Sequence, residues 1–509
     1  MRPHVFTLAN FCLLSLAVLL AGPAARAQNA EDLIQPQEPR VLTLDQCLAI
    51  GMENNIGLRQ VRLGTDISLL DRIRAESAFD PGFELDLSTR RSESPDSGSS
   101  SRTSSQLDLA MRYRMPTWTG GGWVFSMDQG RSTGSTNVGE TTSAFTSYSS
   151  QVGIAYNLPL LEGYGERMNR IGVRRADLGV LRSEAQVNEA ERSLRLSIIE
   201  AYMRAVLAAK QIEVAQVSLQ TAENLVDEVQ ARINVGQLAP YELLAAQAGL
   251  AERREALLNS DTVLATALDS LKELVGLPLT DEVGVDPDIL KAIYLDVDPD
   301  DLFILAQRNR PDLVDLDLRM QQAQLDLMLA ADRRQASLSW NTIVGLAGQD
   351  EDLPQSLGDL SHLTLYTGIE YRLPLGGNRA AEADVSSAQL AIDQLTLQRI
   401  NSLRVLQRDI RSAVEVFRNA LLRIDVTSQG LEVQEVKMES ELARHELGLI
   451  TSRDLLEFDL DLANARLAYD TALADAITAL SRIEYLVNLP MIDDAVVIGD
   501  ILDEPEVDE

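Results

Sequence analysis

Apolar residues recur every seven positions along two long stretches of the chain, each time in two rows. In the first stretch the rows are Val180, Val187, Leu194, Ala201, Ala208, Ala215, Ala222 and Val229, and Ile198, Ala205, Ile212, Leu219, Val226 and Ile233. In the second stretch they are Leu403, Ile410, Phe417, Ile424, Leu431 and Met438, beside the sparser Val414, Leu421 and Leu442. Spacings that alternate between three and four residues are typical of coiled-coil helices. We therefore predict two long helices, over residues 166–235 and 379–447.

Each long helix has two shorter helical segments available to cover it. At about 1.5 Å of rise per residue, the helix 166–235 spans roughly 105 Å, and helices 44–77 and 241–275 stacked end to end span roughly 100 Å. Helices 299–335 and 453–487 stand in the same relation to helix 379–447. A compact globule has no room for such rods, so we predict an elongated, antiparallel helical bundle.

Between these helices the chain alternates apolar and polar residues with a period of two. Four such segments lie between residues 83 and 158, including a hairpin at 107–128, and two more lie between 337 and 374. Alternation of this kind predicts strands with one apolar face, in either a soluble sandwich or a membrane barrel.

Two features of these strands favour the membrane. One end has the short turn 116–122, whereas the other carries the Ser/Thr/Gly-rich stretches 92–105 and 131–147, which we predict to be long loops. Tyr113, Trp118 and Trp123 gather at the short-turn end, where interfacial aromatic residues are expected. Aromatic packing in a soluble hairpin is the other interpretation. Open sheet edges are not tolerated in lipid, so a barrel would have to be closed by several chains.

The chain contains an internal tandem repeat. Tyr241–Leu244 followed by Leu274–Pro278 returns as Arg453–Leu456 followed by Leu486–Pro490. We assign a first repeat to residues 41–278, a connection to 279–298 and a second repeat to 299–490. Duplication on this scale predicts two similar structural halves.

The two ends of the chain stand apart from the repeats. An apolar run from Phe11 to Leu20 and the Ala25-Arg26-Ala27 triplet predict a secretory signal peptide over residues 1–27, followed by a linker at 28–40. Residues 491–509 are acidic, which predicts a disordered tail.

Composition excludes several classes of protein. The chain has 45 basic and 77 acidic residues, and without the two Arg of the leader the balance is 43 − 77 = −34, so nucleic acid is excluded as a partner. Cys12 lies in the leader, which leaves Cys47 alone without an intramolecular disulfide. The three histidines lack metal-ligand spacing, and Gly120–Gly122 lacks the Lys-Ser/Thr of a phosphate loop. We predict no catalytic residue, no cofactor and no metal.

The ordered set of motifs resembles the TolC-type outer-membrane efflux protein family. It comprises the leader, the tandem repeat, Leu-Thr-Leu-Asp-Gln-Cys-Leu-Ala at 42–49, Leu-Pro-Leu before each long helix and a glycine at each helical hairpin tip. The resemblance implies a mainly α protein with a β-barrel portion. It implies a homotrimeric channel whose barrel lies in the outer membrane and whose α-helical tunnel crosses the periplasm to an adaptor and an inner-membrane pump.

The extra hairpin departs from the family pattern of two strands per repeat. If hairpin 107–128 enters the barrel, each chain contributes six strands and a trimer has eighteen. If it projects as a flap, the barrel has the family's twelve.

The glycine-centred turns at the two hairpin tips are candidate adaptor contacts. Gly236 and Gly448 suit the left-handed position that ends a helix, and Leu238 and Ile450 occupy matching sites just beyond them. These two side chains could instead only pack the hairpin.

An acidic face beyond the second tip is a candidate periplasmic gate. Asp454, Glu457 and Asp461 lie at i, i+3 and i+7, on one face of a helix. Three copies around a constriction would form a ring that attracts cations. The other interpretation is a solvated acidic surface.

A protein of another class remains as an alternative, namely a periplasmic coiled-coil adaptor or scaffold without a pore. It explains the heptads and the leader, but not six alternating strands. The substrate is left open between drugs, metals and secreted proteins.

Overall fold

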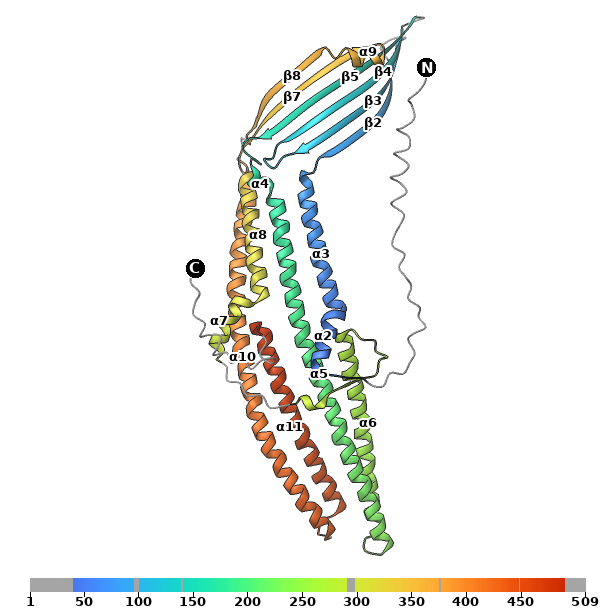
Figure 1. Ribbon diagram of the computed structural model, residues 1–509, viewed down its shortest axis with the longest axis vertical. Helices are drawn as coiled ribbons and strands as arrows, with labels where there is room; N and C mark the ends of the chain where they lie inside the picture. The colour runs from blue at the N-terminus through green and yellow to red at the C-terminus, as the bar shows by residue number, and fades with distance from the viewer. Residues whose placement is uncertain are drawn as a thin grey trace, which may run out of the picture.

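The computed structural model describes residues 40–95, 100–138, 141–290, 298–374, 377–447 and 449–489. The predicted signal peptide, the linker up to residue 39 and the acidic tail lie outside these residues, as does Gly448. The described chain is an elongated molecule with a sheet at one end and a stem of helices at the other (Figure 1).

The elements follow one another in two similar halves. The first half contains β1 (Arg40–Leu42), α2 (Leu44–Asn54), α3 (Ile56–Glu76), η1 (Ser77–Phe79), β2 (Gly82–Pro95), β3 (Ser100–Pro116), β4 (Gly122–Val138), β5 (Thr141–Pro159), α4 (Glu166–Asn169), α5 (Ile171–Asn234), α6 (Tyr241–Val275), β6 (Val283–Val285) and η2 (Pro287–Ile289). The second contains α7 (Pro299–Asn309), α8 (Pro311–Arg333), β7 (Ser337–Asp350), α9 (Leu353–Gly358), β8 (His362–Arg372), α10 (Arg379–Glu446) and α11 (Ser452–Val487).

In the stem, each long helix packs along two shorter ones. Helix α5 contacts α3 and α6, and α10 contacts α8 and α11. The two halves join where α5 packs against α8 and α11. Within the described residues, no helix combines the length and the apolar character needed to cross a bilayer.

Three of the predicted helices are broken. The segment expected over 44–77 divides at Asn55, whose side chain accepts a hydrogen bond from Leu58 N (2.8 Å) and donates one to Leu274 O (2.8 Å). The segment expected over 299–335 divides before Pro311, because proline is unsuited to a helix interior but suits its first turn. The long helix expected from residue 166 divides at Arg170 into α4 and α5.

The six main strands form one antiparallel sheet in the order β2-β3-β4-β5-β7-β8. The strands of the extra hairpin, β3 and β4, lie inside this sheet and pair with β2 and β5. The hairpin is therefore not a flap that projects from a four-stranded sheet.

The long loops predicted at residues 92–105 and 131–147 are wrong. Strands β2 and β3 stay paired out to Pro95 and Ser101, and β4 and β5 out to Val138 and Thr141. Small polar residues do not interrupt a backbone ladder, because its hydrogen bonds join main-chain groups.

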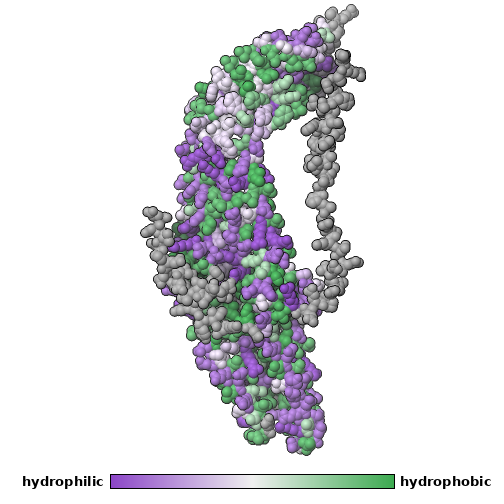
Figure 2. All heavy atoms as spheres, viewed as in Figure 1, coloured by the Kyte–Doolittle hydropathy of each residue, from purple (hydrophilic) through white to green (hydrophobic). Residues whose placement is uncertain are grey.

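The strand register separates an apolar from a polar face across the whole sheet. One row of paired residues is Leu85, Met111, Met127, Val152, Leu346 and Leu363, and the adjacent row is Asp86, Ala110, Asp128, Gln151, Ala347 and His362. Residues of the second row line a cavity of about 470 Å³ that extends from β2 to β8. The polar face is therefore concave and the apolar face convex. Apolar side chains gather at the sheet end, whereas the middle of the stem is largely hydrophilic (Figure 2).

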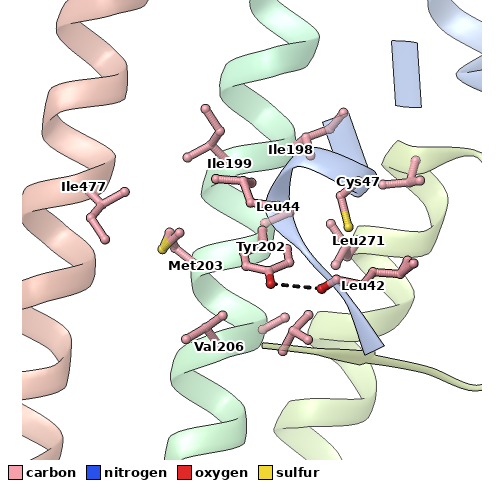
Figure 3. Packing of buried hydrophobic residues seen from close by; sticks show 14 of the residues in the cluster. Leu42, Leu44, Cys47, Ile198, Ile199, Tyr202, Met203, Val206, Leu271 and Ile477 are labelled. Carbon is pink, nitrogen blue, oxygen red and sulfur yellow. Dashed lines mark hydrogen bonds between the residues drawn. The ribbon is translucent and has the colours of Figure 1, made fainter. Parts of the chain in front are cut away.

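A buried tyrosine organises the core in the middle of the stem. Tyr202 of α5 is fully buried and donates a hydrogen bond to Leu42 O (3.0 Å) (Figure 3). It also accepts one from Asp286 N (3.1 Å). These bonds fasten the small parallel sheet of β1 and β6 to α5. Burial raises the pKa of Tyr202 to about 12 and that of the neighbouring Cys47 to about 11, so both stay neutral at physiological pH.

We expect Tyr202→Phe to lower the free energy of unfolding by about 2 kcal/mol, because the hydroxyl serves two buried backbone groups. The measurement is thermal unfolding of the purified protein in detergent. Tyr164→Phe, which alters an exposed tyrosine, is the matched control. Equal unfolding midpoints for the two variants would contradict the role assigned to Tyr202.

Candidate functional site

The two faces of the sheet suit two different solvents. The convex face presents mostly apolar side chains over the middle of the strands, with Thr342 and Thr367 hydrogen-bonded to each other on β7 and β8, whereas the concave face carries charges. On the concave face, Arg114 pairs with Glu84 (2.9 Å) and Arg112 lies 3.7 Å from Asp128. The concave side can therefore line a water-filled space while the convex side contacts an apolar medium.

The aromatic residues singled out in the sequence lie at the stem end of the sheet. Tyr113 and Trp123 are on the convex face, where Tyr113 approaches Phe125 (ring centroids 6.1 Å apart) and Trp123 packs on Tyr156 (4.4 Å). Tyr113 is 40% exposed and Trp123 is 38% exposed. Tyr156 and the adjoining Trp340, 6.2 Å away, belong to the same group and were missed in the sequence because they come from a later strand and from the other repeat.

Trp118 has a different position, in the turn between β3 and β4. Its ring stacks on Phe79 (3.9 Å), and the guanidinium of Arg170 lies over it (4.8 Å). In the same turn, Thr119 O accepts a hydrogen bond from Gly165 N (3.0 Å). The turn of the extra hairpin is thus attached to the corner that leads into α5.

The two helical hairpin tips lie together at the far end of the stem (Figure 1). At the first tip, Gly236 has φ +76°, which is the left-handed conformation that favours glycine. Leu238 packs, half buried, against the cluster formed by Leu225, Val229 and their neighbours. Ile450 at the second tip is also half buried. Leu238 therefore already has packing partners within this chain, and Ile450 is only partly accessible.

Other apolar side chains at the tips are more exposed than the two predicted ones. Val235 is 70% exposed at the first tip, and Leu447 and Leu449 are 76% and 65% exposed at the second. Val235 and Leu447 each directly precede the tip glycine of their repeat. That shared position was the sequence signal that could have identified Val235 and Leu447.

The three carboxylates of the candidate gate have unequal surroundings. Asp454 accepts hydrogen bonds from Thr451 N (3.0 Å) and Thr451 Oγ1 (2.7 Å), and these bonds lower its pKa. Because this pKa is depressed, the cap contributes stability at neutral pH that is lost as the pH falls through the folded pKa. Asp461 pairs with Lys437 (3.3 Å), whereas Glu457 is exposed.

A polar contact between α6 and α11 lies beside these carboxylates. Arg253 donates a hydrogen bond to Leu456 O (2.9 Å), and its Nε lies 3.9 Å from Asp459 Oδ2. Asp459 is 6% exposed, so the pair is largely shielded from water. This contact joins the two hairpins near their tips, and it was missed because the residues belong to different repeats. Across the described residues, no three His, Cys, Asp or Glu side chains cluster as metal ligands.

Comparison with known proteins agrees with this architecture. Residues 124–277 match the family model for outer membrane efflux proteins, while no curated sequence matches the chain significantly.

The fold is similar to that of solved outer-membrane channels. The Campylobacter jejuni CmeC channel is 16% identical, with a TM-score of 0.67 over 91% of this chain and 88% of that one. The open state of the Neisseria gonorrhoeae MtrE channel is also 16% identical, with a TM-score of 0.65 over 88% and 89%. The Vibrio cholerae VceC protein is 16% identical, with a TM-score of 0.64 over 87% of this chain and 95% of that one. At these identities the likeness establishes the fold.

If the acidic face of α11 lines a constriction, Asp454→Ala/Asp461→Ala will reduce the preference of the channel for cations, because two carboxylates per chain are removed. Reversal potentials in planar bilayers with a salt gradient measure this preference. Asp300→Ala/Asp301→Ala, at the start of α7 and away from the tips, is the control. Unchanged cation selectivity in the α11 variant would remove the gate assignment.

Proposed function

We propose that this chain, a member of the outer membrane efflux protein family, is the exit duct of a tripartite efflux or type I secretion system. It lies in the outer membrane and extends a long helical stem into the periplasm. Substrates delivered by an inner-membrane pump would pass through the stem and leave through the sheet end. The family and its structural neighbours are channels, and we propose no enzymatic activity.

The observation that carries the proposal is the two-faced sheet with open edges. Along one convex row, Tyr113, Phe125, Ile154 and Val344 are 39–43% exposed, whereas Phe83 on β2 and Leu365 on β8 are each 67% exposed. Both edge strands lack a neighbour within the described chain. An apolar face and unpaired edges in lipid require further copies, so β8 of one chain would pair with β2 of the next.

The stem also has surfaces that suit further copies. Ile56, Leu63 and Leu70 of α3 are seven residues apart, and each is at least 60% exposed. Leu390 and Leu397 of α10 form a second row of this kind. Apolar rows at heptad spacing favour contact with another helix, so we propose a homotrimer in the stem as well as in the sheet.

The tips are the proposed docking surface for a periplasmic adaptor. In the sequence the two tips are marked by Gly236 with Leu238 and by Gly448 with Ile450. The exposed side chains Val235, Leu447 and Leu449 supply apolar surface there. Exposed apolar residues at the end of a hydrophilic stem suit burial against a partner.

The alternative, a periplasmic coiled-coil adaptor or scaffold without a pore, leaves the sheet unexplained. Such a protein would expose the convex apolar face of six strands to water. Membrane fractionation separates the two functions, because a scaffold would not be found in the outer membrane as a trimer.

Cryo-EM of the purified protein will show eighteen strands in the wall of a trimeric barrel, six from each chain, because β3 and β4 are paired on both sides within the sheet. A twelve-stranded wall with the hairpin outside it would contradict this prediction.

Introducing charge at the tips will weaken adaptor binding. We expect Val235→Glu/Leu449→Glu to lose most of its binding to the adaptor of its own system, because charged groups would have to be desolvated in an apolar contact. Pull-down with the purified adaptor measures this loss, and Val217→Glu, an exposed position further up α5, is the control. Equal binding by both variants would place the adaptor elsewhere.

A further inference from the structure

The short helix α9 lies on the apolar, convex face of the sheet at the end away from the stem. It connects β7 to β8 and contacts β5 and β7. Ser150 and Gly348, which face it, are paired with each other across these two strands. The next pair on the same face toward the stem is Val152 and Leu346, which are apolar. Helix α9 therefore sits at the outer margin of the apolar belt.

The seat of α9 is built by specific contacts. Ser356 is fully buried, and its Oγ lies 2.9 Å from Ser150 Oγ, which also donates to Gln129 Oε1 (2.8 Å). A Cβ at Gly348 would collide with Ser356 O, so only glycine lets the helix approach this closely. The helix is thus held against the sheet, and it is not a loose excursion of the connection.

The other side chains of α9 suit the boundary between lipid headgroups and acyl chains. Leu353 and Leu357 lie one turn apart on one flank, and each is 39% exposed. Asp352 and Asp359, which border the helix, are exposed. An apolar flank beside charged, exposed residues is the amphipathic arrangement of a segment that lies in the membrane interface.

We propose that α9 is a membrane-interface anchor, with Leu353 and Leu357 in contact with lipid at the headgroup boundary of the outer leaflet. This inference rests on the proposed channel function, which places the convex face in the membrane. A second copy of the chain is a less suitable occupant, because α9 packs on β5 and β7 whereas the open edges of the described sheet are β2 and β8.

Lipid-quenching fluorescence tests the proposal on the full-length trimer. An environment-sensitive fluorophore is attached to Leu357→Cys, to Leu363→Cys on the convex face of β8, and to Thr364→Cys on its concave face. Cys47 is fully buried and leaves the introduced thiol as the accessible one. The proteins are reconstituted into phosphatidylcholine vesicles that carry a nitroxide either near the headgroup or deep in the acyl chain.

We expect the label at position 357 to lose most of its fluorescence to the shallow nitroxide. The label at 363 should respond to a lipid-borne nitroxide, and the label at 364 to neither. Quenching of the 357 label by aqueous iodide alone, or by no quencher because a neighbouring copy covers it, would overturn the anchor. Failure of the 363 label to respond to lipid would instead overturn the membrane position of the sheet.

Gly348→Val tests the seat itself. The added side chain should displace α9, so that the 357 label loses its response to lipid while the 363 label keeps it. Gly358→Ala, where a Cβ meets open space, is the matched control. An unchanged response at 357 in Gly348→Val would show that the glycine does not position the helix.

Discussion

A sheet in a bilayer must pair every backbone N–H and C=O, because lipid offers no hydrogen-bonding partner. This constraint determines the assembly of the molecule. The six strands satisfy one another internally, but β2 and β8 each leave a row of main-chain groups open. The alternation of apolar and polar rows then assigns the convex face to lipid and the concave face to water. In the proposed channel, closure by several copies and a water-filled interior follow from that single requirement.

The stem obeys a different constraint, because the length of each long helix must be covered by shorter helices stacked end to end. One long helix in each half is covered by two shorter ones, and the junctions between the short helices are built from polar contacts. In the first half, Asn55 caps α3 and also bonds to Leu274 O. In the second half, Asn488 bonds to Asn309 O (2.8 Å). In both halves an asparagine side chain thus joins two short helices at their ends, α3 with α6 in the first half and α11 with α7 in the second.

Sheet and stem meet at a joint to which the extra hairpin contributes. The β3–β4 turn places Trp118 between Phe79 and Arg170, and Gly163 N donates to Asp332 Oδ2 (2.8 Å) beside it. Residues from both repeats therefore meet at this joint. The insertion that distinguishes the first repeat is part of the sheet wall and also braces the corner from which α5 begins.

The sequence alone determined the periodic features, because hydrophobic spacing of seven and of two is a local property of helices and strands. It identified both long helices within a few residues and placed alternating segments where the six strands lie. It misjudged residues 92–105 and 131–147, since whether small polar residues form a loop or a strand depends on a partner strand that periodicity does not reveal. Proline explains the division before Pro311, but the division at Asn55 depends on a carbonyl more than two hundred residues away.

Only the tertiary structure decided which candidate side chains are available to a partner. Leu238 and Val235 are both apolar and three residues apart, yet one packs in its hairpin and the other is exposed. Asp454 and Glu457 share a helix face, yet one is engaged in a cap. The seat of α9 and the contact between Arg253 and Asp459 join segments from different repeats. Sequence spacing specifies the face of an element, but burial and pairing depend on the neighbour that packs against that face.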